Sequence, residues 1–158
     1  MSRVASLRAP DETVVVLLGE YTDIRSPLSL DGRELRSALG HFPTSVVAIT
    51  GTDGDQPVGV TVGSFASVSL KPALVGFFIG RDSRSWARIR PGGRFMVNLL
   101  GSDQEEVCQA LASKDPDKFT GVPWQPTKLG LPLIDGARGW IQCHIDREVE
   151  TGDHTLVL

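Results

Sequence analysis

Three short runs between residues 45 and 80 constrain the fold of this chain more than any other feature. Ser45–Thr50 (SVVAIT) is apolar and β-branched, and Ala73–Gly80 (ALVGFFIG) is fully apolar, as a buried strand would be. Between them, Val58–Leu70 (VGVTVGSFASVSL) alternates in the period of a strand. The turn cluster GTDGDQP and the breaker Lys71-Pro72 separate the three runs. Together they predict an antiparallel meander.

Further strands are expected in the second half of the chain. Arg94–Leu100 and Gly139–Glu150 have the composition of strands. Gly152-Asp153 favours a hairpin turn, and the residues after it begin a return strand. Residues 114–138 are rich in Pro and Gly and are predicted to be irregular.

Three short helices complete the expected elements. The first lies in DGRELRSALGHF, residues 31–42. The second lies in DSRSWARIR, where Asp82 or Ser83 can cap the helix before Pro-Gly-Gly ends it. The third spans Ser102–Ser113, with Ser102 as its cap and Glu105 at the capping-box position.

This order of elements predicts a mainly β fold, because many short strands with few short helices are typical of a small closed or half-closed barrel. The barrel domain is expected over residues 31–158. An N-terminal arm, residues 1–30, precedes it, and the segment TVVVLLG could add a strand there. The chain stops early in the return strand, so the domain is expected to lack its last strand or strands. That would leave an unpaired edge unless another chain covers it.

Composition and motifs exclude several classes of protein. The formal net charge is −3, whereas a nucleic-acid-binding protein usually has a basic surface. No apolar run approaches the roughly 20 residues of a membrane span, and Val14–Leu18 is too short for a signal-peptide core. We therefore expect a cytoplasmic protein that binds neither nucleic acid nor membrane.

The usual catalytic and metal-binding motifs are also absent. The sequence contains no GxSxG, HExxH or GxxxxGK[ST] motif, and no GxGxxG between a strand and a helix. Cys108 and Cys143 form no CxxC pair and are expected to be reduced thiols. Cys143, His144 and His154 are too few for a zinc site, so no metal is expected.

The stretch VTVGSFASVSL is polar without being charged. Its hydroxyl groups stand among apolar residues, and Gly63 removes a side chain where another group could approach the backbone. Hydroxyls and free backbone N–H groups suit a neutral, flat, hydrogen-bonding ligand. An ordinary amphipathic strand with a solvated polar face would have the same pattern.

The stretch GRDSRSW gathers Arg81, Ser83, Arg84 and Ser85 at the start of an expected helix. Guanidinium and hydroxyl groups there favour an anion, most naturally a phosphate. A capped and solvated helix start would also explain the serines, but not both arginines. Together, the two stretches fit a mononucleotide such as a flavin, which needs donors for its ring, an apolar surface and cations for its phosphate.

Six segments occur in the order and spacing of a known family: LRSALGHFPTSVVAIT, PVGVTVGSFASVSLKPALV, SRSWARIRPGGRFMVNLL, SKDPDKFTGVPW, LPLIDGARGWIQC and GDHTLVL. Over about residues 33–158 the chain resembles the flavin reductase-like domain, the FMN-binding split-barrel family. It is most similar to the reductase components of two-component flavin-dependent monooxygenases, including those that serve aromatic and steroid-ring hydroxylation.

The resemblance implies a split β-barrel of the Greek-key type and usually a homodimer, with flavin at or near the dimer interface. Such proteins reduce FMN or FAD with NADH or NADPH and release the reduced flavin to a separate oxygenase. It also implies a set of flavin-binding residues. These are Thr44 and Ser45 in the first lining strand; Thr61, Val62, Gly63, Ser64, Phe65, Ser67, Val68 and Ser69 along the ring; Arg81, Arg84 and Ser85 at the phosphate; Ala110 and Leu111 near the far ring edge; and Phe119, which would help to close the pocket.

His154 matches the histidine of the family's GDH motif, so the resemblance implies a catalytic role on the nicotinamide side. Asp153 would orient its ring or shape the turn. On local grounds alone, the same two residues suit a solvent-facing hairpin turn.

The chain departs from the family pattern at Ser45, where Gly is more common, and at Gly63, which replaces a commoner polar side chain. The family also continues past the GDH strand by at least one strand. Two other functions therefore stay open. One is a non-catalytic flavin-binding or dimerisation module, and the other is a split-barrel oxidase or deazaflavin enzyme with other substrates.

Overall fold

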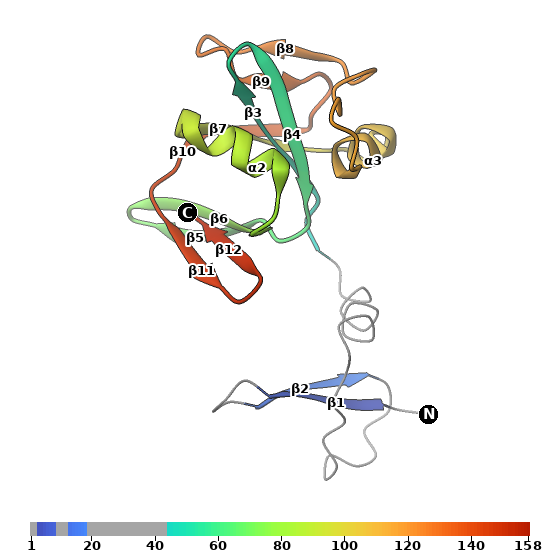
Figure 1. Cartoon of the computed structure of the whole chain (residues 1–158), viewed down its shortest axis with the longest axis vertical. Helices are drawn as coiled ribbons and strands as arrows, with labels where there is room; N and C mark the ends of the chain where they lie inside the picture. The colour runs from blue at the N-terminus through green and yellow to red at the C-terminus, as the bar shows by residue number, and fades with distance from the viewer. Residues whose placement is uncertain (1–2, 9–12, 19–43) are drawn as a thin grey trace. The chain divides into compact units, whose positions relative to one another are not determined.

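The computed structural model describes residues 3–8, 13–18 and 44–158, in two compact units that divide between Pro43 and Thr44 (Figure 1). In the first unit, β1 (Arg3–Arg8) pairs antiparallel with β2 (Thr13–Leu18) along its whole length. The strand expected from TVVVLLG is confirmed as β2. The helix expected at residues 31–42 lies outside the described residues.

The second unit is built on two four-stranded antiparallel sheets and a small two-stranded one. The first large sheet has the order β10-β7-β3-β4, with β3 (Val47–Asp53), β4 (Gln56–Val62), β7 (Arg94–Leu99) and β10 (Gly139–His144). The second has the order β11-β12-β6-β5, with β5 (Ala66–Leu70), β6 (Ala73–Gly80), β11 (Glu148–Thr151) and β12 (His154–Val157). The small sheet pairs β8 (Trp124–Pro126) with β9 (Pro132–Ile134) inside the segment expected to be irregular.

Short helices connect the sheets. They are α2 (Arg84–Ile89), which continues as the 3₁₀ turn η1 (Arg90–Gly92), and α3 (Glu105–Ala112). Large sheets that do not close into one ring, with few short helices, confirm the predicted mainly β split barrel (Figure 1). Within the described residues, no helix has the length and apolar content to cross a bilayer.

The predicted meander is wrong, because the run Val58–Leu70 is not one strand. It divides into β4 and β5, which belong to different sheets. At the break, the Ser64 hydroxyl accepts a hydrogen bond from the Phe78 N–H (2.9 Å) and donates one to the Phe78 carbonyl (3.2 Å). The Ser64 side chain here replaces the backbone of a neighbouring strand as the hydrogen-bond partner of Phe78. The chain can therefore change sheets while the N–H and carbonyl of Phe78 stay hydrogen-bonded.

The expected strand Gly139–Glu150 divides in the same way, into β10 and β11 on different sheets. The return strand is confirmed as β12, joined to β11 by the turn at Gly152-Asp153. It pairs with β11 on one side and with β6 on the other, so β12 itself is not an edge strand. The outer strands of this sheet are β11 and β5.

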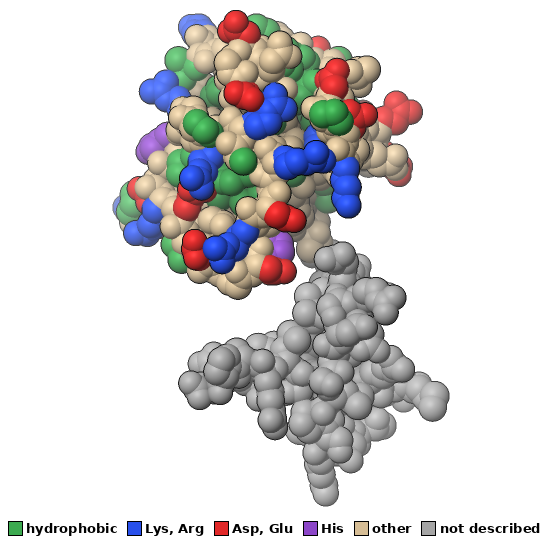
Figure 2. All heavy atoms as spheres, in the orientation of Figure 1, with side chains coloured by type: hydrophobic (Ala, Val, Ile, Leu, Met, Phe, Trp, Pro, Cys, Tyr) green, Lys and Arg blue, Asp and Glu red, His purple; other side chains and the backbone are tan. Residues whose placement is uncertain are grey.

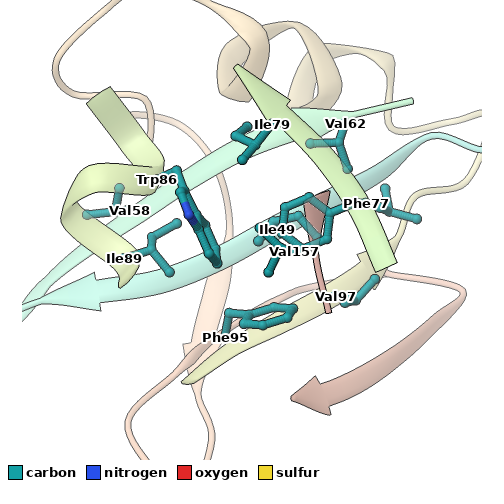
Figure 3. Close-up of a cluster of buried hydrophobic side chains, with 11 residues drawn as sticks. Ile49, Val58, Val62, Phe77, Ile79, Trp86, Ile89, Phe95, Val97 and Val157 are labelled. Carbon is teal, nitrogen blue, oxygen red and sulfur yellow. The ribbon is translucent and has the colours of Figure 1, made fainter. Parts of the chain in front are cut away.

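The main core lies between the two large sheets and centres on three aromatic rings (Figure 3). Phe77, Trp86 and Phe95 meet edge to face, with ring centroids 5.4 to 5.8 Å apart. A second core cluster contains Ala48 and Leu111. Because Ile49 faces the first cluster and Ala48 the second, β3 is buried on both faces, which explains its continuous apolar run.

Strand β6 has the predicted bounds but is not fully buried. Phe77 and Ile79 enter the core, whereas Phe78 between them is 44% exposed. Its apolar content therefore reflects two faces with different surroundings, one in the core and one open.

The predicted caps of the two helices had different outcomes. The Ser83 hydroxyl accepts a hydrogen bond from the Trp86 N–H (3.3 Å) and caps α2, which was one of the two expected possibilities. The cap predicted for α3 is wrong, because Gln104 rather than Ser102 precedes the helix. The buried Gln104 side chain instead accepts from the Gly101 N–H and donates to the Asp135 carbonyl.

Candidate functional site

A cleft of about 660 Å³ opens between β4, the first turns of α2 and the segment that follows α3. Its floor is the β4 stretch Pro57-Val58-Gly59. One wall carries Asp82, Ser83, Arg84, Ser85 and Arg88, and the other is formed by residues 113–116, 118 and 119. Lys and Arg side chains gather on the face of the molecule that carries α2 and α3 (Figure 2). The cleft thus contains three of the predicted site residues, Arg84, Ser85 and Phe119.

Two cations of the cleft are held close together. Arg84 donates from Nη2 to the Lys114 carbonyl (2.8 Å), and Lys118 donates from Nζ to the Leu111 carbonyl (2.8 Å). Burial, and then the neighbouring charge of Arg84, lower the pKa of Lys118. Neither side chain forms an ion pair with a described residue, whereas Arg88 pairs with Asp53 (2.8 Å). Asp82 and Asp115 also line the cleft, but neither forms an ion pair with Arg84 or Lys118. Two adjacent cations without an ion-pair partner favour an anion such as a phosphate.

Lys118 was missed by the sequence reasoning, although its neighbour Phe119 was predicted. A lysine among the polar residues SKDPDK is typical of a solvated loop. Its partner Arg84 lies on another element, far away in the chain, so only the fold brings the two charges together.

The residues predicted to line the flavin ring lie outside this cleft. Thr44, Ser45 and Gly63 come together, because a Cβ added at Gly63 would lie 3.2 Å from Thr44 Oγ1. Ser45 donates from its hydroxyl to the Phe65 carbonyl (2.8 Å), and Thr61 donates to the Cys108 carbonyl (2.9 Å). The missing side chain at Gly63 therefore allows the close approach of Thr44, and the hydroxyls of Ser45 and Thr61 already donate within the protein.

The other predicted ring residues differ in exposure. On β5, Ser67 and Val68 are exposed and Ser69 is half-buried, as are Ser64 and Phe65 at the break before it. Val62 belongs to the main core cluster, and Leu111 is fully buried in the second one beside Ala110. Val62 and Leu111 are therefore core residues that pack behind the predicted ring-side residues.

Arg81 lies at the turn of the β11–β12 hairpin and not at the cleft. Its backbone N–H donates to the Asp153 carbonyl (3.1 Å), and its guanidinium pairs with Glu150 (3.4 Å). In the strand register, His154 stands opposite Gly80, directly before Arg81. Arg81 therefore ties β6 to the turn that carries His154, and the cation at the cleft beside Arg84 is Lys118.

His154 and Asp153 form a close pair. His154 Nδ1 lies 2.7 Å from Asp153 Oδ1, and the imidazole is about half exposed, with 49% of its side chain open to solvent. Because a carboxylate accepts hydrogen bonds, the pair favours a proton on Nδ1 and leaves Nε2 as the second contact atom of the ring.

The Cys143 thiol is not an activated nucleophile. Burial raises the pKa of the Cys143 thiol to about 11, so this thiol stays protonated near neutral pH. Neither thiol is in a disulfide bond. In the part of the chain that the structure describes, no cluster of three or more His, Cys, Asp or Glu side chains could hold a metal.

Gly59 sets how closely α3 and Phe119 approach the floor of the cleft. A Cβ at this position would lie 2.8 Å from Leu111 Cδ2 and 3.1 Å from Phe119 Cε2. We expect Gly59→Ala to lower the free energy of unfolding by about 1–3 kcal/mol, the usual range for an overpacked core. Urea unfolding measures this loss. Gly139→Ala is the matched control, since no atom lies within 4 Å of its added Cβ, and an equal loss there would contradict the assignment.

Comparison with known proteins agrees with this geometry. Residues 39–158 match the family described as "Flavin reductase like domain". A flavin reductase from Pseudomonas putida is 44% identical over 131 residues, which cover 82% of this chain and 77% of the relative. The NADH-dependent FMN reductase SmoA of Agrobacterium fabrum is 32% identical, with coverage of 100% and 84%.

Comparison with a solved structure supports the same family at the level of the fold. Nitrilotriacetate monooxygenase component B from Mycobacterium thermoresistibile superposes with a TM-score of 0.75 at 43% identity, covering 79% of this chain and 70% of its own. The match to the family covers the whole of β3 to β12 and includes the cleft and the GDH turn. This chain belongs to the flavin reductase-like domain family.

Proposed function

We propose that this chain is an NAD(P)H-dependent flavin reductase that supplies reduced flavin to a separate monooxygenase. The observation that carries the site assignment is the Arg84–Lys118 pair, two cations without an ion-pair partner among the described residues, in the cleft between β4, α2 and the segment after α3. The residues present therefore fit a flavin with a phosphate.

When bound, the flavin supplies the redox chemistry, accepting at N5 the hydride that leaves C4 of the nicotinamide. The protein itself would bind and orient the flavin and the nicotinamide, and would hold protons at defined atoms. Arg84 and Lys118 would hold the phosphate, and the segments around Ser45 and Gly63 would hold the ring. Fixed geometry of this kind is what a direct transfer between two rings requires.

His154 would orient the nicotinamide. The Asp153 carboxylate holds the proton on Nδ1, so Nε2 is available to accept a hydrogen bond, for example from a carboxamide N–H. Arg81 supports this turn through the Asp153 carbonyl. The predicted catalytic residue would thus be a positioning group, and the cofactors would carry the hydride.

A homodimer is part of this proposal. Large apolar side chains are exposed beside the ring-side residues, namely Val46 (40%), Val68 (51%), Leu70 (84%) and Phe78 (44%). Exposed apolar groups of this number mark interaction surfaces, and a second copy would also shield the open ring site. Light scattering should give twice the 17.0 kDa of one chain; a monomer that still turns over flavin would contradict the dimer.

The separate monooxygenase partner follows from the relatives, one of which is itself a monooxygenase component. We place the reaction in the cytoplasm, where NADH is regenerated.

Anaerobic oxidation of NADH, followed at the absorbance of the reduced nicotinamide, tests the function directly. The purified chain should oxidise NADH only with added flavin, at many turnovers per protein. Flavin binding without turnover would favour the non-catalytic module instead. Turnover without added flavin would favour a split-barrel oxidase.

A further inference from the structure

The β11–β12 hairpin, which carries the GDH turn, stands at the edge of its sheet. β12 pairs with β6, whereas β11 is an outer strand whose four residues are exposed. A pocket of about 250 Å³ separates this hairpin from α2 and η1, and Trp86, Arg90, Glu148 and Thr155 contribute to its lining. The position of the hairpin relative to α2 therefore depends on the side chains that cross this pocket.

Glu148 is the β11 residue that reaches across to α2. Its Oε1 accepts a hydrogen bond from Trp86 Nε1 (2.7 Å), and its Oε2 lies 3.7 Å from Arg90 Nη1. Only 26% of the Glu148 side chain is open to solvent, although β11 is an edge strand. A hydrogen bond to a carboxylate is roughly twice as strong as one between neutral groups, and partial burial strengthens it further.

The other end of this hydrogen bond is fixed. Trp86 is buried, and its ring meets those of Phe77 and Phe95 edge to face in the main core (Figure 3). Trp86 also belongs to α2, two residues after Arg84, which lines the cleft. The contact with Glu148 thus joins the hairpin to a helix that the core already holds in place.

The strand register shows which face of the hairpin Glu148 holds. Glu148 stands opposite Val157, which is fully buried in the main core, so this face points inward. His154 stands opposite Thr151, three residues further along β11. Because side chains alternate between the faces of a strand, His154 lies on the other face. Glu148 therefore fixes the hairpin from its inner side, and the orientation of the outer face follows.

We propose that Glu148 is a positioning residue for the nicotinamide side of the reaction. Through Trp86 it fixes the hairpin, and with it the His154 imidazole, relative to α2 and its Arg84. The inference rests on the proposed function, in which His154 orients the nicotinamide and Arg84 holds the flavin phosphate. Glu148 acts only through the hairpin.

Steady-state kinetics at saturating flavin test this role. Glu148→Ala should lower kcat/KM for NADH by about tenfold, less than the roughly 100-fold of a full 1 Å displacement. The flavin dissociation constant should stay within about twofold, because the core still holds α2. Glu148→Gln keeps an acceptor for the indole and should recover most of the loss. Glu106→Ala, which removes an exposed carboxylate from α3, is the matched control and should change neither quantity.

A double-mutant cycle with His154→Ala separates positioning from a general structural effect. Residues that act through one another have non-additive effects. In a chain that already lacks the imidazole, Glu148→Ala should therefore cost less than about twofold in kcat/KM. The same tenfold loss in both backgrounds would overturn the inference, as would Gln and Ala variants of Glu148 with equal losses.

Hydrogen exchange of the backbone amides keeps the test independent of turnover. Glu148→Ala should speed exchange in β11 and β12 by at least about tenfold, the factor expected for one lost hydrogen bond to a charged group, and should leave β3 unchanged. Unchanged exchange in the hairpin would overturn the inference even in an active enzyme. A wild-type chain that neither binds flavin nor oxidises NADH would overturn the proposed function instead, and faster exchange in the variant would then still support the link between Glu148 and the hairpin.

Discussion

Removing the charges of Arg84 and Lys118 together, as Arg84→Met with Lys118→Met, is expected to weaken FMN binding by about 10²–10⁴-fold. Each cation would donate a charge-assisted hydrogen bond to the phosphate, worth about 1.5–3 kcal/mol, and the two losses combine to that factor. Methionine keeps much of the apolar stem of each side chain, so the walls of the cleft stay filled. Fluorescence quenching of the flavin measures the dissociation constants.

Riboflavin separates the charge effect from a general loss of the site. Because it has the ring but no phosphate, its affinity should stay within about twofold in the double variant, the usual effect of a substitution that touches no contact. Each single variant should lie between the wild type and the double variant. The assignment fails if riboflavin and FMN lose affinity equally, or if thermal unfolding shows that the variants have lost their fold.

The lowered pKa of Lys118 gives a second test of the same pair. In the free protein, burial and then the Arg84 charge favour the neutral amine, whereas a bound phosphate favours the ammonium form. FMN binding therefore raises the pKa of Lys118 and takes up protons between the bound and free values. FMN affinity should fall as pH rises through the free-protein pKa, and riboflavin affinity should not. Titrations from about pH 7 to about pH 9.5, below the ordinary lysine pKa, follow this effect.

Lys118→Arg is the control for this pH dependence. An arginine stays charged throughout that range, so the fall in FMN affinity should disappear while the affinity near neutral pH is largely kept. A fall of the same size in the arginine variant would assign the titration to another group.

Local patterns predicted the elements well, but not the way in which they are joined. β6 has its predicted bounds, and the Ser83 cap and the Gly152-Asp153 turn follow from short-range chemistry that the sequence displays directly. The division between β4 and β5 depends on Ser64 bonding the backbone of Phe78 on another strand. A period of two continues through such a break, so the alternation of residues gives no sign of it.

The same limit applies to the site. Arg84, Ser85 and Phe119 could be found because the six segments match a family in order, and they do line one cleft. Lys118 and Gly59 could not, because their roles depend on long-range contacts with Arg84 and with Leu111. Arg81 lies only three residues before Arg84 in the sequence, yet the direction of the chain at the end of β6 places it at the GDH turn. Arg81 and Arg84 thus lie at different parts of the proposed site, Arg81 at the GDH turn and Arg84 in the cleft.

Replacing His154 with alanine is expected to lower kcat for NADH-dependent flavin reduction by about 10- to 100-fold, while the flavin dissociation constant stays within about twofold. The imidazole is about half exposed and held by Asp153, and no flavin-cleft residue bonds to it in the part of the chain that the structure describes. Its loss should therefore misplace the nicotinamide without disturbing the flavin. A displacement of about 1 Å in a reacting group can cost about 100-fold.

The split between kcat, KM and flavin affinity decides whether His154 positions the nicotinamide or only shapes the turn. His154→Gln keeps an acceptor on a planar group and should recover part of kcat, whereas a purely structural role would give Gln and Ala the same loss. His144→Ala is the matched control, because His144 is exposed at the end of β10, opposite Arg94 in the strand register. If His154→Ala turns over like the His144 variant, the nicotinamide side of the site must be formed by other groups. If flavin binding falls together with kcat, His154 belongs to the flavin site. The assignment of the nicotinamide to the GDH turn would then be wrong.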